Sequence, residues 1–83
     1  MTQEQIMPKL TSFVGQYVNI NEITPDLDLF ASGRVNSLFA MQLVLFVEKE
    51  FDFKVENDDL DYENFKSLDA ILGFILRKLT VDA

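Results

Sequence analysis

Ser37 is the residue of this 83-residue chain whose position offers most for chemistry. It ends a polar, turn-prone stretch that includes Gly33 and Asn36, and a long apolar helical pattern begins there. A serine at such a boundary is well placed to cap the helix, with its hydroxyl at the positive end of the helix dipole. A phosphate attached to that hydroxyl would meet exposed backbone N–H groups. The position therefore suits a plain helix cap, a phosphate-linked attachment point, or both.

The composition excludes most of the catalytic chemistry that a serine can support. The chain has no Cys and no His, which excludes disulfides, thiolate catalysis and thiolate metal sites, and removes the commonest general base. A serine without a base is not a competent nucleophile. The acidic run from Glu56 to Glu63 lacks the glycine and the ligand spacing of a calcium loop, so we interpret it as a solvated face. We therefore expect neither an enzyme nor a metal site.

The charge balance bears on partners and location. The net charge is −7, and the seven basic residues are scattered, which argues against binding nucleic acid or an anionic membrane. A basic protein partner complements this charge, although acidity can also serve solubility alone. The segment Met1–Glu4 lacks the basic region of a signal peptide, and no apolar run is long enough to span a bilayer. We expect a cytoplasmic monomer.

Helical periodicity predicts an all-α fold, a small four-helix bundle with three main helices and one short helix. Thr2 and Gln5 form a capping-box pattern at the start, and Ser67 is suited to cap the last helix. The length indicates one domain over residues 1–83. The expected helices cover about residues 3–18, then 37–51, about 61–65, and 67–79.

The segment between the first two helices, residues 19–36, shows no sustained period and holds turn residues such as Pro25 and Gly33. An ordered loop of this length is uncommon and tends to be functional. Its apolar residues, including Leu29 and Phe30, indicate that the loop is pinned across the core.

The second helix is apolar on most sides, so a domain of this size cannot bury all of its side chains. One stripe suits the core: Leu43, Val44, Val47 and Phe51. A second stripe lies on a different face: Leu38, Met41 and Leu45. The pattern leaves two places open for Phe39 and Phe46, either against the loop or as part of the second stripe.

The run Gly33-Arg34-Val35-Asn36-Ser37-Leu38 resembles the phosphopantetheine attachment motif of acyl and peptidyl carrier proteins, whose usual form is Gly-x-x-Asp-Ser-Leu. The resemblance extends over nearly the whole chain. Asp28-Leu29-Phe30 is similar to the hydrophobic lead-in of that family, and Leu43 to Phe51 to its second helix. Glu63-Asn64-Phe65 followed by Ser67-Leu68 is similar to the short third helix and the start of the last one.

The resemblance implies an acyl carrier protein with a 4′-phosphopantetheine arm on Ser37, added from coenzyme A by a phosphopantetheinyl transferase. The arm would hold an acyl group as a thioester and supply a thiol that the chain lacks. The implied partners are this transferase, acyl-loading and acyl-modifying enzymes, and acyltransferase or synthase modules. Because that family uses its second helix for recognition, the implied docking residues are Leu38, Met41 and Leu45, with Glu48 and Glu50 pairing with basic residues on the partners.

Asn36, which supports the site from the adjacent position, departs from the usual Asp of the motif. It keeps hydrogen-bonding capacity and caps helices well, but it lacks the negative charge. The run from Val35 to Leu43 resembles stand-alone carriers of polyketide and mixed peptide–polyketide antibiotic pathways, some of which carry unusual malonyl-type extender units. The alternatives are a peptidyl or aryl carrier protein, and a helical interaction module without a prosthetic group.

Overall fold

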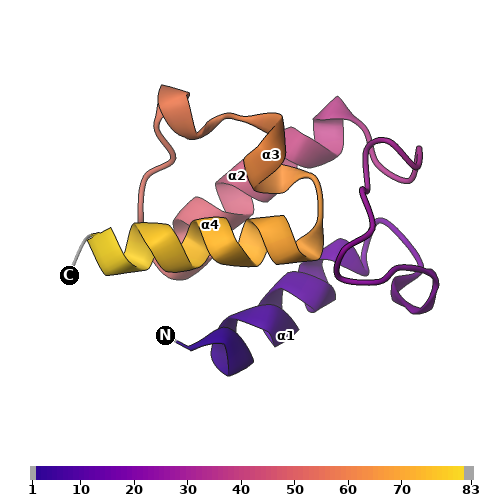
Figure 1. Cartoon of the computed structure of the whole chain (residues 1–83), viewed down its shortest axis with the longest axis horizontal. Coiled ribbons are helices and arrows are strands. Elements are labelled where there is room, and N and C mark those ends of the chain that lie inside the picture. The colour runs from indigo at the N-terminus through magenta and orange to yellow at the C-terminus, as the bar shows by residue number, and fades with distance from the viewer. Residues whose placement is uncertain (1, 82–83) are drawn as a thin grey trace.

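The structure is a computed structural model that describes residues 2–81, so Met1, Asp82 and Ala83 of the expected domain lie outside the description. No strand occurs in the described range. The predicted all-α fold with three main helices and one short helix is confirmed (Figure 1). The helices are α1 (Gln3–Val14), α2 (Ser37–Phe51), α3 (Tyr62–Phe65) and α4 (Leu68–Val81), with two 3₁₀ turns, η1 (Ile20–Glu22) and η2 (Asn57–Asp59).

The other helices gather around α4. It packs against α1 on one side and α3 on another, and it also contacts α2. In Figure 1, the long first loop and the start of α2 lie at one end of the molecule, while the start of α1 and the end of α4 lie at the other. The segment that contains the attachment-like motif is therefore presented at an end of the bundle.

Each main helix contributes a buried stripe to one core. In α2 the predicted core residues Leu43, Val47 and Phe51 are buried, but Val44 is only half-buried. Phe39 is the fourth buried residue of α2, because it continues the same steps of four residues toward the start of the helix. The other buried residues of the main helices are Ile6, Leu10 and Val14 of α1, and Leu68, Ile71, Leu72, Phe74 and Ile75 of α4.

Phe39 and Phe46, which the sequence alone leaves unplaced, both take part in packing between α1 and α2. Phe39 is 2% exposed, and its ring centroid lies 5.8 Å from that of Phe13 and 5.1 Å from that of Tyr17. The half-buried Phe46 stacks on Phe13, with centroids 4.4 Å apart and planes 16° from parallel. The aromatic side chains therefore join the first two main helices.

The first helix is shorter than predicted. We expected it to end near residue 18, but α1 ends at Val14 and the chain continues in turns. The N–H groups of Gln16 and Tyr17 bond carbonyls three residues back rather than four. Such tighter turns keep apolar side chains on nearly the same face. The helical spacing of apolar residues in the sequence therefore continues past the end of the α-helix.

The last helix is displaced slightly from the predicted 67–79, because it covers Leu68–Val81. Ser67 precedes it as the expected cap, and its Oγ accepts the N–H of Ala70 at 3.1 Å. At the other end of the chain, the side-chain oxygen of Gln5 accepts the N–H of Thr2 at 2.9 Å, one of the two contacts of the predicted capping box.

The long first loop is pinned across the core, as predicted, and the structure shows that it is fixed at the junction of α3 and α4. Leu29 is fully buried, and its N–H donates to the Lys66 carbonyl at 2.7 Å. The Pro25 carbonyl accepts the N–H of Asp69 at 2.9 Å, and the hydroxyl of Tyr62 donates to the carboxylate of Asp28. These contacts hold the segment that leads into α2.

Candidate functional site

Ser37 is the first residue of α2, and its side chain is exposed. Within residues 2–81 its hydroxyl has no hydrogen-bond partner, and the backbone N–H groups of Ser37 and Leu38 have no acceptor. Such open donors are a property of the first turn of a helix. The hydroxyl is therefore accessible, and it lies beside two N–H groups that can bind an anion.

The predicted cap by the Ser37 hydroxyl is wrong, because Asn36 caps α2. The Oδ1 atom of Asn36 accepts the N–H of Phe39 at 3.2 Å. The Asn36 backbone is extended, with φ of −133°, and its carbonyl accepts the N–H of Ala40 at 3.2 Å. Two neighbouring residues in the sequence are both able to cap, and only the one with the extended backbone does so.

The turn before Ser37 needs a glycine and is fixed from two sides. Gly33 has a φ of +79°, a left-handed conformation that other residues rarely adopt. The N–H groups of Arg34 and Val35 both donate to the carbonyl of Leu29, at 3.1 and 3.3 Å. The guanidinium of Arg34 also pairs with the carboxylate of Glu22 at 3.0 Å. The backbone that presents Ser37 is thereby held to the loop and to η1.

The second apolar stripe of α2 is open to solvent. Leu38, Met41 and Leu45 are 63%, 65% and 60% exposed. Steps of three and four residues place their side chains along one face of the helix, which begins beside Ser37. The first eleven residues of α2, 37–47, contain no charged side chain. The face next to the attachment candidate is thus apolar and uncharged.

The other two predicted docking residues already have partners within the chain. Glu48 is half-buried and accepts the N–H of Val55 at 2.9 Å, which fixes the segment after α2. Glu50 pairs with Lys9 of α1 at 2.8 Å. The structure therefore brings these carboxylates into internal contacts at the end of α2, and a role in docking stays a prediction for both.

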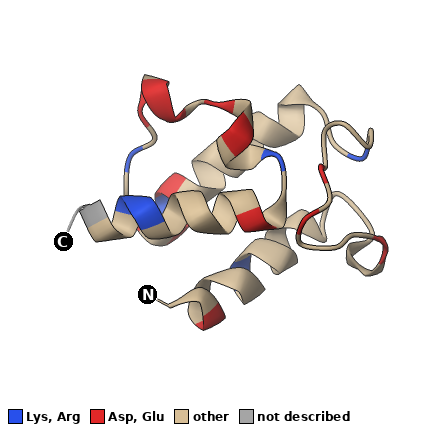
Figure 2. Ribbon diagram, viewed as in Figure 1, with Lys and Arg blue, Asp and Glu red and all other residues tan. Residues whose placement is uncertain are grey.

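Acidic residues are concentrated elsewhere, on the segment from η2 to α3, where the ribbon of Figure 2 is red. Several of them serve local structure. The hydrogen bond from Lys78, at 2.9 Å, lowers the pKa of Asp59 below its ordinary value of 3.8, and the carboxylate of Asp61 accepts the N–H of Glu63 at 2.9 Å. Across residues 2–81, no three such carboxylates gather to hold a metal ion.

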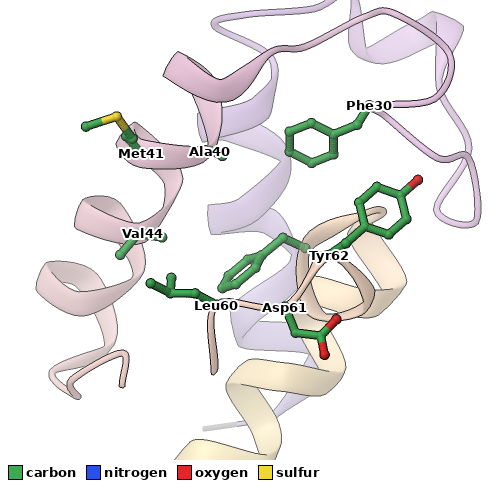
Figure 3. A pocket seen from close by; sticks show the side chains of 8 residues that line it. Phe30, Ala40, Met41, Val44, Leu60, Asp61 and Tyr62 are labelled. Carbon is green, nitrogen blue, oxygen red and sulfur yellow. The ribbon is translucent and has the colours of Figure 1, made fainter. Parts of the chain in front are cut away.

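A pocket of about 280 Å³ opens between α2 and the segment that contains α3 (Figure 3). Its walls include Phe30, Ala40, Met41, Val44, Leu60 and Phe65. The carboxylate of Asp61 and the hydroxyl of Tyr62 point away from the space in Figure 3, which leaves carbon atoms facing it. An aliphatic chain fits such a wall better than a polar group, because polar groups lose their hydrogen bonds to water there.

The residues around Ser37 suit a phosphopantetheine group. An exposed hydroxyl can be esterified, and the N–H groups of Ser37 and Leu38 can donate to phosphate oxygens. Asn36 is neutral, so the residue before Ser37 adds no repulsion to the phosphate charge. No helix in the described range is long and apolar enough to cross a membrane.

Comparison with known proteins gives the same family. The phosphopantetheine attachment site family matches residues 9–75, which include the whole of α2 and the turn before it. An acyl carrier protein of Thermotoga maritima is 30% identical over 80 residues, covering 94% of this chain and 96% of that protein. Members of this family are non-catalytic carriers, whose partners are phosphopantetheinyl transferases and acyl-processing enzymes. The chain belongs to the phosphopantetheine-binding acyl carrier protein family.

Proposed function

We propose that Ser37 is the attachment residue, and that the chain carries an acyl group as a thioester on the arm attached there. The observation that carries this proposal is the exposed, unbonded hydroxyl at the first residue of α2. Asn36 performs the capping that would otherwise occupy that hydroxyl. The domain presents the cargo, and the enzymes that bind it perform the acyl chemistry.

The attachment step requires a partner enzyme. The bond from Ser37 Oγ to phosphorus forms, the phosphoanhydride bond of coenzyme A breaks, and adenosine 3′,5′-bisphosphate leaves. The hydroxyl proton passes to a base of the transferase, since this chain has no His. Once bound, the group supplies the thiol for the thioester.

The apolar face of α2 is the proposed docking surface for the transferase and for acyl-processing enzymes. Leu38, Met41 and Leu45 are exposed and follow directly from Ser37, so an enzyme that reaches the hydroxyl also meets this face. Methionine adapts to differently shaped partners. Glu48 and Glu50 would have to give up internal contacts in order to pair with a basic partner. We therefore assign these two carboxylates a smaller contribution to docking than the three apolar residues.

Polyketide or related antibiotic biosynthesis is the pathway that we propose for this carrier. The resemblance of the run from Val35 to Leu43 to stand-alone carriers of such pathways supports the proposal. A malonyl-type unit, which some of those carriers hold, bears a carboxylate that would be costly to bury against the carbon walls of the α2–α3 pocket. For such a cargo we expect the carboxylate to stay in solvent, where an acyltransferase or synthase can reach it.

Mass spectrometry of the intact protein tests the attachment. After incubation with coenzyme A and a broad-specificity transferase, the wild-type chain should gain one phosphopantetheine, and Ser37→Ala should gain none. Ser32→Ala is the matched control, because Ser32 is an exposed serine of the loop that leads into α2, and its substitution should leave the modification unchanged. Modification of Ser37→Ala, or an unmodified wild-type chain with several transferases, would refute the proposal and favour an interaction module.

The cargo requires a separate measurement. The intact mass of the protein isolated from its native producer, compared with that of the unloaded form, gives the mass of the bound group. An acyl mass agrees with the proposal, and a malonyl-type mass supports the pathway. An aminoacyl or aryl mass would instead identify a peptidyl or aryl carrier.

A further inference from the structure

Two hollows adjoin the start of α2, and they differ in chemistry. The α2–α3 pocket described above is walled by carbon. A second hollow, of about 260 Å³, opens toward the end of α1 and shares no lining residue with the first. Its walls include Tyr17, Gly33, Arg34, Asn36, Leu38 and Phe39.

The second hollow is lined by both apolar and polar side chains. The buried ring of Phe39 lies edge-on to the ring of Tyr17, with centroids 5.1 Å apart, which holds the tyrosine in place. Within residues 2–81 the Tyr17 hydroxyl has no hydrogen-bond partner. Arg34 uses Nη1 to bind Glu22, and its guanidinium has further N–H donors. The hollow therefore offers a hydroxyl and a cation beside an aromatic surface.

This combination matches the chemistry of a phosphopantetheine arm, which joins a phosphodiester and two amides to a branched aliphatic segment. Asn36 and Leu38, the two neighbours of Ser37 in the chain, both line the hollow. Ser37 itself does not line the hollow, so a group esterified to it would enter the hollow past one of these two neighbours. The volume lies just below the usual range for ligand pockets, about 300–1,000 Å³, so it suits part of the arm rather than a whole ligand.

We propose that the hollow between Tyr17 and Arg34 is the resting site of the unloaded phosphopantetheine arm. The inference depends on Ser37 being the attachment residue, as proposed above. Arg34 supplies donors to the phosphate oxygens, and the Tyr17 hydroxyl donates to an amide carbonyl. The aliphatic segment covers exposed apolar surface of Leu38 and of the Tyr17 ring. The carbon-walled pocket offers no comparable donors to the bare arm.

The chain contains a reporter for each hollow. It has no Trp and only two Tyr; Tyr17 lines the second hollow, and Tyr62 lines the α2–α3 pocket. Labelling with 3-fluorotyrosine therefore gives two ¹⁹F NMR signals, which Tyr17→Phe and Tyr62→Phe assign. The experiment compares the unmodified protein with the form that carries the bare arm, after intact mass has shown complete modification.

Addition of the arm should move the Tyr17 signal by more than its line width and leave the Tyr62 signal in place. With the mass gain verified, an unmoved Tyr17 signal, or a Tyr62 signal that moves at least as far, overturns the resting site and leaves the carrier function intact. Absence of any mass gain overturns both the resting site and the carrier function, because the arm is then not attached. The two failures are thus distinguished before any spectrum is recorded.

Two surface variants test the role of Arg34. Arg34→Gln removes the guanidinium and should reduce the change in Tyr17 signal on modification by at least half. Glu22→Gln breaks the same ion pair but keeps the guanidinium, so it should preserve that change. Each variant is compared with its own unmodified form, which cancels any direct effect on the loop. If the change in Tyr17 signal is reduced equally in both variants, the ion pair shapes the loop and Arg34 does not bind the arm.

Discussion

Asn36 and Phe39 are joined by a hydrogen bond of 3.2 Å from the Phe39 N–H to the Asn36 side-chain oxygen, and this bond caps α2. Ser37, between them, takes no part in it. The cap that the sequence assigns to Ser37 therefore belongs to Asn36, and the Ser37 hydroxyl stays free for the proposed attachment. Each role can be removed without the other.

Removal of the cap at Asn36 and removal of the proposed attachment hydroxyl at Ser37 should have different effects on stability. Asn36→Ala should lower the free energy of unfolding by about 1 kcal/mol, the usual loss for a cap. Ser37→Ala should change it by less than about 0.5 kcal/mol, because the side chain is exposed and unbonded. Asn36→Asp keeps an acceptor and serves as the control. Urea unfolding measures all three, and equal losses in the two alanine variants would contradict this assignment.

The two phenylalanines of α2 should contribute unequally to stability. Phe39→Ala removes a ring that is 2% exposed and should cost about 3–5 kcal/mol. Phe46→Ala removes a half-buried ring stacked on Phe13 and should cost about 1–2 kcal/mol. Leu45→Ala, on the exposed face, should fall within about 0.5 kcal/mol of wild type. Chemical denaturation tests the order, and a greater loss for Phe46→Ala than for Phe39→Ala would show that the packing is assigned wrongly.

The apolar face of α2 should control recognition rather than folding. Met41→Asp places a charge in the proposed docking surface and should lower kcat/KM for modification by a transferase at least about tenfold, a loss of about 1.4 kcal/mol in transition-state stabilisation. Gln42→Asp adds the same charge at the next exposed position of the helix and is the matched control. Its kcat/KM should stay within about twofold of wild type. The docking assignment fails if the two variants have the same rate.

Thermal unfolding of these two variants should accompany the kinetics. Both side chains are exposed, so neither substitution should shift stability by more than about 0.5 kcal/mol. A large loss of stability in Met41→Asp alone would attribute its slow modification to unfolding. Leu45→Asp, on the same exposed face, would then replace it as the test.

The contact between Asp59 and Lys78 should make stability fall in acid. The hydrogen bond from Lys78, joined by the N–H of Glu56, lowers the pKa of Asp59 in the folded protein. A lowered folded pKa contributes stability above the unfolded pKa, and this contribution is lost as the pH falls through the folded value. Asp59→Asn should therefore be less stable than wild type at pH 7. The difference should shrink below about pH 4.

Unfolding curves recorded for both proteins between neutral pH and acid measure that difference directly. Comparison with the variant separates the contribution of Asp59 from every other effect of acid on stability. Asn at this position keeps a side-chain oxygen that can accept the N–H of Glu56, so the substitution removes chiefly the charge. A difference that stays constant down to pH 3 would show that the charge of Asp59 contributes nothing.

The sequence by itself determined the helices, the pinned loop and the attachment motif, because each has a local signature. Helical spacing located α2, and Ser67 was recognisable as a cap. The apolar residues of the loop indicate that it is pinned across the core, and the structure shows that Leu29 is the one that is fully buried. The exposed stripe of Leu38, Met41 and Leu45 follows from a helix with more apolar faces than a small core can cover.

Only the tertiary structure decided which neighbouring residue caps α2, where α1 ends, and what the remaining side chains contact. The sequence offers Glu48 and Glu50 as docking residues, and only the structure shows their internal contacts with the Val55 N–H and with Lys9. The hollow between Tyr17 and Arg34 joins residues seventeen positions apart in the chain. Periodicity reports spacing along one helix, whereas these features depend on the packing of separate segments, and that packing places their side chains side by side.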